Sequence, residues 1–176
     1  MKCLRFFLLL ALALPGCEEK VRPSIVSLPD ANVPSQESWR STVTFSDSAR
    51  IKAILWAGHI AVHASSQFTL LDDSIHVDFF DEAERHSSTL TALRGRVDDR
   101  TRDFDAHENV VVVSDSGVVL KTDSLFWNNA GRIIHTPAYV VITSKTEEIR
   151  GTGLVSDQSL KNYTFTKVSG RAVTRE

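Results

Sequence analysis

Residues 120–142 read LKTDSLFWNNAGRIIHTPAYVVI, two apolar runs on either side of the short segment from Asn128 to Gly131. β-Branched and aromatic residues, which favour strands, are frequent in both runs. Asn and Gly accept the backbone conformations of tight turns. The stretch is therefore predicted to be a β-hairpin.

The same pattern occurs 30 residues earlier, in LTALRGRVDDRTRDFDAHENVVV at 90–112, and the two stretches align without a gap. Such strand-turn-strand units cannot bury an apolar face alone, so they stack on their neighbours to form a continuous core. The repeat predicts a stack of antiparallel strand-turn-strand units. Matching positions include the pairs Leu90–Leu120, Val97–Trp127, Arg102–Arg132 and Phe104–Ile134.

The rest of the chain after Cys17 also has a period of two. Residues 74–79, SIHVDF, place Ile75, Val77 and Phe79 on one face of a strand and polar residues on the other. No stretch of a dozen residues shows the 3.6-residue period of a helix. The prediction is an all-β fold, with turns at the acidic or glycine-containing segments 72–73, 81–82, 98–99 and 115–117.

The composition is that of an ordinary single-domain protein. The chain has 176 residues, of which 42% are hydrophobic and 24% are charged, enough for one domain with its own core. The formal net charge of −2 gives no sign of a basic face for DNA or RNA. We therefore expect no nucleic-acid partner.

Residues 1–16 have the pattern of a secretory signal peptide. Lys2 and Arg5 precede an apolar run that is too short to span a bilayer as a helix. The segment Leu14-Pro15-Gly16-Cys17 resembles the cleavage box of bacterial lipoproteins. We expect removal of the leader and lipidation of Cys17, which would anchor the chain to a membrane. The alternative is an ordinary signal peptide followed by a chance cysteine.

Residues 17–40 are predicted to be a tether behind this anchor. Pro23, Pro29 and Pro34 block regular structure and favour extended chain. We expect the folded domain to cover residues 41–170, followed by a short tail at 171–176.

The histidines and carboxylates form no recognisable catalytic or metal site. His59 and His63 share a strand face, but at roughly 3.3 Å per residue they lie about 13 Å apart, too far for one ion. The acidic pairs fall at predicted turns, where Asp caps backbone amides. No G-x-S-x-G motif is present. We therefore expect a protein that is not an enzyme and that uses no metal or cofactor.

Several segments, in order, resemble the LptC family. The C-terminal half is represented by TDSLFWN (122–128), GRIIHT (131–136), YVVIT (139–143), RGTGLVSD (150–157) and YTFTKVSG (163–170). The N-terminal half is represented by VTFSDSARIKAIL (43–55), HVDFFD (76–81) and STLTA (88–92). The resemblance covers residues 41–170 and implies an open, twisted β-jellyroll of the OstA/LptA-like type.

The resemblance also implies a function without a reaction or a cofactor. Members of this family receive lipopolysaccharide from the ABC transporter of the inner membrane and pass it to an LptA-like jellyroll protein that bridges the periplasm. Many members are anchored by an uncleaved transmembrane helix, whereas this chain has the lipoprotein-like Cys17. The expected location is the periplasmic side of the inner membrane. Sorting of the lipoprotein to the outer membrane stays open.

Acyl chains need an apolar trough, which the inward face of the strands would supply. The residues expected to line this trough are Ile75, Val77, Phe79, Phe104, Val110, Val112, Leu125, Trp127, Val140, Ile142 and Phe165. At Val140 to Ile142 both faces of the strand are apolar, so the sequence does not decide which face points inward.

The two unpaired edges of the stack would accept strands of neighbouring proteins by β-augmentation. We expect Val43 and Phe45 at the edge that faces the transporter. Tyr163 and Phe165 are expected at the edge that faces the bridge protein. Gly151 and Gly153 are expected beside the last turn, where they permit close strand approach.

Two other classes of function stay open at this point. One is a structural adaptor lipoprotein of the envelope, with a sealed core and working edges. The other is a polysaccharide-active enzyme, which would need two carboxylates about 5–10 Å apart across a cleft.

Overall fold

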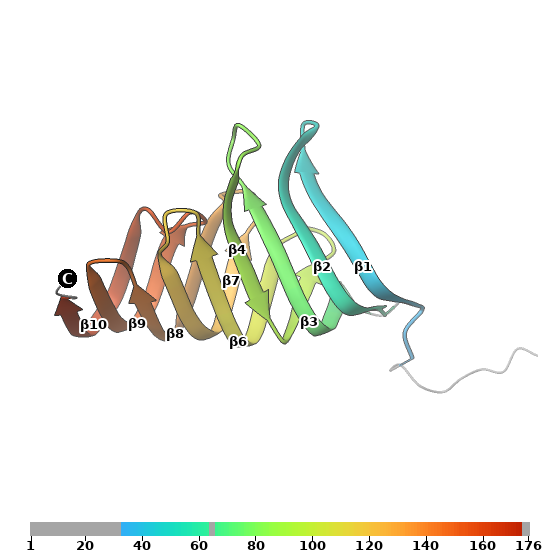
Figure 1. Ribbon diagram of the computed structural model, residues 1–176. Helices are drawn as coiled ribbons and strands as arrows, with labels where there is room; N and C mark the ends of the chain where they lie inside the picture. Colours follow the sequence, from blue (N-terminus) through green and yellow to red (C-terminus); the bar gives the residue numbers. More distant parts are fainter. Residues whose placement is uncertain (1–32, 64–65, 174–176) are drawn as a thin grey trace, which may run out of the picture. The chain divides into compact units, whose positions relative to one another are not determined.

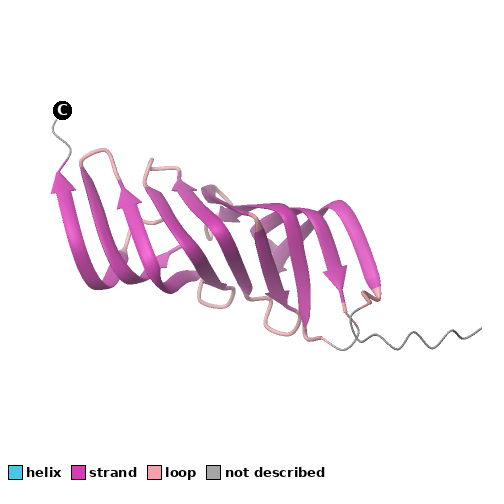
Figure 2. Cartoon of the chain, turned by 90° about the horizontal axis from the view of Figure 1, so that it is seen from below, coloured by secondary structure: helices cyan, strands magenta, loops and turns pink. Residues whose placement is uncertain are grey.

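The alternating sequence folds into strands in the computed structural model, which describes residues 33–63 and 66–173 (Figures 1 and 2). The all-β prediction is confirmed. Cys17 and most of the predicted tether lie outside the described residues. Within the described ranges, no helix is long and apolar enough to cross a bilayer. The strands are β1 (Gln36–Asp47), β2 (Arg50–Val62), β3 (Phe68–Phe80), β4 (His86–Ala92), β5 (Arg94–Asp98), β6 (Phe104–Ser114), β7 (Val119–Asn128), β8 (Ile133–Thr143), β9 (Glu147–Asp157) and β10 (Tyr163–Val173).

All ten strands belong to one antiparallel sheet, in the order β1-β2-β3-β4-β6-β7-β8-β9-β10. β4 and β5 share one position between β3 and β6, because this strand is interrupted only at Leu93. Apart from β4 and β5, consecutive strands therefore lie side by side from β1 to β10 (Figure 1). Among the described residues, β1 pairs only with β2 and β10 only with β9, so the sheet is open at both edges. This is the expected jellyroll-like stack.

The 30-residue repeat corresponds to two strand positions and the turn between them. The first copy forms β4, β5 and β6, and the second forms β7 and β8. Asp98 in one copy and Asn128 in the other accept backbone N–H bonds from the turn. The arginine after each turn has a positive φ, 63° at Arg102 and 53° at Arg132. The two copies thus agree in local backbone geometry as well as in sequence.

Most strands bend near the middle, and the bends line up across the sheet. The ladder shifts register at Gly58 in β2, at 108–109 in β6 and at 137–138 in β8. Each such bulge adds residues to one strand and bends it. Neighbouring bends touch, because Leu93 donates its N–H to the carbonyl of Glu108 at 3.0 Å. We call this line of bends the crease.

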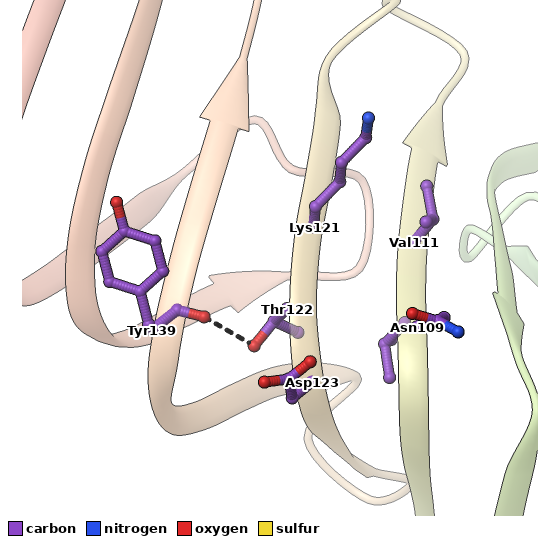
Figure 3. Close-up of a pocket in the computed structure, with 7 residues that line it drawn as sticks. Asn109, Val111, Lys121, Thr122, Asp123 and Tyr139 are labelled. Carbon is purple, nitrogen blue, oxygen red and sulfur yellow. Dashed lines mark hydrogen bonds between the residues drawn. The ribbon is translucent and has the colours of Figure 1, made fainter.

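Side chains at the crease satisfy backbone groups that the bulges remove from the ladder. Thr122 Oγ1 donates to the carbonyl of Tyr139 at 2.9 Å (Figure 3). Thr136 Oγ1 accepts the N–H of Ala138 at 3.1 Å. The bends are therefore built into the structure with hydrogen bonds of their own. A hollow at the crease is lined by Asn109, Val110, Val111, Lys121, Thr122, Asp123 and Tyr139 (Figure 3).

The crease divides the sheet into two leaves with the core between them. The first leaf carries the turns at 48–49, 81–85, 115–118 and 144–146. The second leaf carries the β5–β6, β7–β8 and β9–β10 turns, the end of β2 and the start of β3. Long strands can contribute to both leaves because each one bends. The largest fully buried side chains are Trp127, Phe79, Phe104, Leu55, Ile75, Leu90, Leu120, Leu125, Ile134, Ile142, Leu154 and Leu160.

Two predicted turn assignments were wrong. Asp72 and Asp73 lie inside β3, where Asp73 has a φ of 58°, a conformation that Asp adopts more readily than most residues. This acidic pair marks a bend at the crease and not a reversal of the chain. Gly151 and Gly153 lie within β9 and not beside the last turn, which covers 158–162.

The sheet is also slightly longer than expected. β1 begins at Gln36, inside the predicted tether, and β10 ends at Val173, inside the predicted tail.

Candidate functional site

An unbroken row of aliphatic side chains crosses the inner face of the first leaf. At about 4.8 Å between strands, the row extends over about 34 Å. Its members from Leu55 to Ile142 are at most 1% exposed. We call these residues the aliphatic row. From β1 to β9, its cross-strand neighbours are Val43, Leu55, Val77, Leu90, Val112, Leu120, Ile142 and Ile149.

Aromatic side chains join the two leaves beside this row. The ring of Trp127, on the second leaf, lies 5.7 Å from the ring of Phe45 and 5.3 Å from that of Phe79, measured between centroids. Phe45 and Phe79 belong to the first leaf. Phe104, the cross-strand neighbour of Trp127, is also buried. These rings fill the space between the leaves.

The structure buries ten of the eleven residues predicted to face the interior. These are Ile75, Val77, Phe79, Phe104, Val110, Val112, Leu125, Trp127, Val140 and Ile142. The eleventh, Phe165, is half-buried and packs against the core. Where both faces are apolar, Val110 and Val112 point inward, and Val113 is 45% exposed. Burial fixes where these side chains lie, and their contact with lipid stays a prediction.

The interior is closed to solvent in this conformation. The exposed fractions of Phe79, Val112 and Val140 are all zero. An acyl chain that enters between the leaves therefore has to displace packed side chains.

The two edges of the sheet expose the ends of the interior. Val43 on β1 is half-buried, while Phe45 is 5% exposed. Tyr163 and Phe165 on β10 are half-buried, with ring centroids 6.1 Å apart in an edge-to-face arrangement. Burial raises the pKa of the Tyr163 hydroxyl. The apolar interior thus reaches partly exposed side chains at both edges.

Gly151 and Gly153 permit the close approach of β9 and β10. A Cβ at Gly151 would lie 2.5 Å from the carbonyl oxygen of Lys167. Gly153 has a φ of 71°, and a Cβ there would lie 2.5 Å from Oγ1 of Thr166. A side chain at either glycine would therefore collide with β10, but both glycines lie within β9 and not beside the last turn.

At the strand ends away from the crease, side chains and turns of the two leaves contact each other. Among the described residues, no strand pairing links the leaves there. Arg132 Nη1 and Gln158 Nε2 both donate to the carbonyl of Phe80, at 3.2 and 2.5 Å. Lys52 Nζ donates to the carbonyl of Asn129 at 3.3 Å. We call this join the seam. A few hydrogen bonds hold the leaves together here.

The turn carboxylates bind backbone amides, as turn chemistry predicts. The N–H of Arg85 lowers the pKa of Asp81, and the N–H of Thr101 lowers the pKa of Asp98. His59 lies 3.1 Å from both Glu37 and Asp72. In the described part of the chain, no group of three or more His, Cys, Asp or Glu side chains could hold a metal ion.

Sequence reasoning missed half of the interior and all of the seam. Leu90 and Leu120 stood opposite each other in the repeat alignment, and that alignment could have identified them as core. Leu55 alternates with Ala53 in the same way as the predicted interior residues. The seam has no local signal, because its partners come from turns far apart in the sequence.

Comparison with known proteins agrees with this arrangement. Residues 33–171, which include all of β1 to β9 and nearly all of β10, match the family model described as "Lipopolysaccharide-assembly, LptC-related". A search of curated proteins finds no matching relative. Because the match extends over most of the chain, this protein belongs to the LptC-related family of lipopolysaccharide-assembly proteins.

Proposed function

We propose that the chain is a non-enzymatic lipid-transfer module. In this proposal it receives lipopolysaccharide from the inner-membrane ABC transporter and passes it to an LptA-like bridge protein in the periplasm. Its family has a role in lipopolysaccharide transport at the periplasmic side of the inner membrane. The aliphatic row carries the proposal, because it runs from the open edge at β1 to β9, the strand next to the open edge at β10.

The two edges give the proposal its direction. β1 and β10 each have one side without a partner strand among the described residues. Each edge therefore offers free backbone groups for a strand of a neighbouring protein. In this arrangement the β1 edge meets the transporter and the β10 edge meets the bridge protein. Acyl chains then move along the interior from one neighbour to the next.

The anchor in this proposal is a lipid on Cys17. The supporting observation is the lipoprotein-like segment Leu14 to Cys17. Mass spectrometry of the mature N-terminus should find an acylated cysteine. An unmodified mature chain that begins elsewhere would exclude this form of attachment.

Photo-crosslinking in cells tests whether lipid enters the interior. A benzoylphenylalanine at Phe79, which is buried, or at Phe165, which is half-buried, should form an adduct with lipopolysaccharide. The same residue at His76 should not, because that side chain is 47% exposed on the outer face of β3. If the two interior positions give no adduct in a folded protein, lipid transfer through the core is excluded.

A structural adaptor is the second candidate, and the closed interior favours it. With Phe79 and Val112 fully buried, the core could serve only to hold the edges in place. The same experiment separates the two functions, since an adaptor gives no lipid adduct at either interior position.

A further inference from the structure

The repeat places one arginine of each copy at the seam. Arg102 follows the β5–β6 turn and Arg132 follows the β7–β8 turn, both on the second leaf. Because these turns are two strand spacings apart, the two residues lie roughly 10 Å apart along the leaf. Arg132 reaches the carbonyl of Phe80 on the first leaf, and Arg102 borders a hollow with residues 43–46 of β1. The guanidinium of Arg132 therefore faces the first leaf, and Arg102 lines a hollow that the first leaf borders.

Neither arginine is neutralised by a carboxylate within 4.0 Å among the described residues. The nearby acids form hydrogen bonds or ion pairs with other groups. Asp47 pairs with Lys52 Nζ at 3.3 Å. Asp103 accepts the N–H of Asn129 at 2.9 Å, and Glu84 accepts a backbone N–H at 2.8 Å. Both guanidinium groups thus keep N–H donors that no carboxylate within 4.0 Å occupies.

The hollow beside Arg102 has a polar rim and an apolar floor. The ring of Phe45 is 5% exposed and packs edge-on against Trp127 in the core. The ring of Phe45 therefore separates the hollow from the core. Its lining residues are Val43, Thr44, Phe45, Ser46, Arg102 and Asn129.

Three buried polar atoms near the seam have no hydrogen-bond partner among the described residues. They are Asn129 Oδ1, Trp127 Nε1 and Gln158 Oε1. Trp127 is 1% exposed and Gln158 is 5% exposed. Buried polar groups normally find a partner, so unpaired ones need an explanation. Two acceptors and one donor fit a ligand with hydroxyl or amide groups.

We propose that the seam at Arg102 and Arg132 binds the phosphorylated sugar headgroup of the transported lipid. This inference rests on the proposed function, because the acyl chains of the same lipid lie in the core. Phosphate groups accept bidentate hydrogen bonds from arginine. Sugar hydroxyls pair with Asn129 and Gln158. The headgroup stays at the rim, because burial of its charges in the core is costly.

The same contacts explain how the closed interior opens. Arg132 supplies one of the hydrogen bonds that hold the seam shut, to the carbonyl of Phe80, which Gln158 also binds. When Arg132 turns to a phosphate, that bond between the leaves is lost. Entry of the acyl chains past Phe45 is thereby coupled to recognition of the headgroup.

Binding to the full-length protein in a non-ionic detergent tests the proposal. The probes are lipid A with both phosphates, the same lipid A without phosphates, and inorganic phosphate. We expect Arg102→Gln and Arg132→Gln each to weaken binding of phosphorylated lipid A about tenfold, the usual effect of losing a charge-assisted hydrogen bond. Binding of the dephosphorylated lipid should not change. Arg100→Gln is the matched control, because Arg100 is an exposed arginine of the same turn as Arg102 that does not line the hollow.

Three outcomes overturn the headgroup site. The first is unchanged binding of phosphorylated lipid A in the double variant, and the second is equal loss of both lipid forms. The third is arginine-dependent binding of inorganic phosphate as tight as that of the lipid, which would make the seam a free-phosphate site. In each case the proposed function survives if the dephosphorylated lipid binds the wild-type protein. If neither lipid form binds the wild-type protein, the proposed function fails.

Discussion

His59 links the first strand to the rest of the sheet through two carboxylates. The strength of this link depends on whether the imidazole is protonated. Its ring nitrogens lie 3.1 Å from Glu37 on β1 and 3.1 Å from Asp72 on β3. Burial alone would lower the pKa of His59, but hydrogen bonds with the two carboxylates outweigh it and raise the pKa above 6.5. A raised pKa in the folded state gives stability that is complete below about pH 6.5 and is lost as pH rises through the folded-state pKa.

We therefore predict that β1 is held less firmly as pH rises above about 6.5. Protection factors from amide hydrogen exchange, which correct for the intrinsic pH dependence of exchange, should fall for Gln36 to Trp39. His59→Gln should have low protection at every pH. The readout is local to β1, so His76 and His86, which contact Asp78 on β3, do not interfere. An identical pH profile in the variant would show that His59 does not hold the strand.

At the scale of the element, the sequence predicts strands well and bends poorly. Alternation identifies β3 and β8 because the two faces of each strand differ in burial. Bends within strands contain the same residue types as turns. The sequence alone therefore could not show whether Asp72 and Asp73 form a bend or a reversal of the chain. The direction that the chain takes after such a residue depends on pairing with both neighbouring strands. That pairing is not encoded within the segment itself.

The close contact between β9 and β10 depends on the absence of a side chain at Gly151. A Cβ at Gly151 would meet the carbonyl oxygen of Lys167 at 2.5 Å, and this backbone atom cannot move without disturbing the pairing of β10. We predict that Gly151→Ala lowers the free energy of unfolding by about 1–3 kcal/mol, as overpacking does. Urea denaturation measures the loss, and hydrogen exchange should place it in β10. Gly170→Ala is the control, since a Cβ there meets nothing within 4 Å. Equal losses in the two variants would argue against the close approach as the cause.

At the scale of the whole sheet, the two leaves meet with an offset. Strands near the N-terminus on the first leaf contact turns near the C-terminus on the second. Ser88 in β4 donates to the carbonyl of Gln158, and Lys52 in β2 donates to that of Asn129. These partners are separated by 70 and 77 residues. The interior faces followed from local alternation, whereas the seam depends on how far the folded sheet twists, which no short segment reveals.

If lipid moves along the aliphatic row, an obstacle in its middle should separate the two ends. Leu120 in β7 has an exposed fraction of zero, and Leu120→Trp would fill the interior there at a cost of about 1–3 kcal/mol. We predict that a photo-crosslinker at Val43 still captures lipopolysaccharide in this variant, while one at Ile149 no longer does. Lys121→Trp is the matched control, because the next side chain lies on the exposed outer face. Urea denaturation confirms that both variants are folded. Capture at Val43 and Ile149 alike in the Leu120 variant would mean that lipid does not travel along this row.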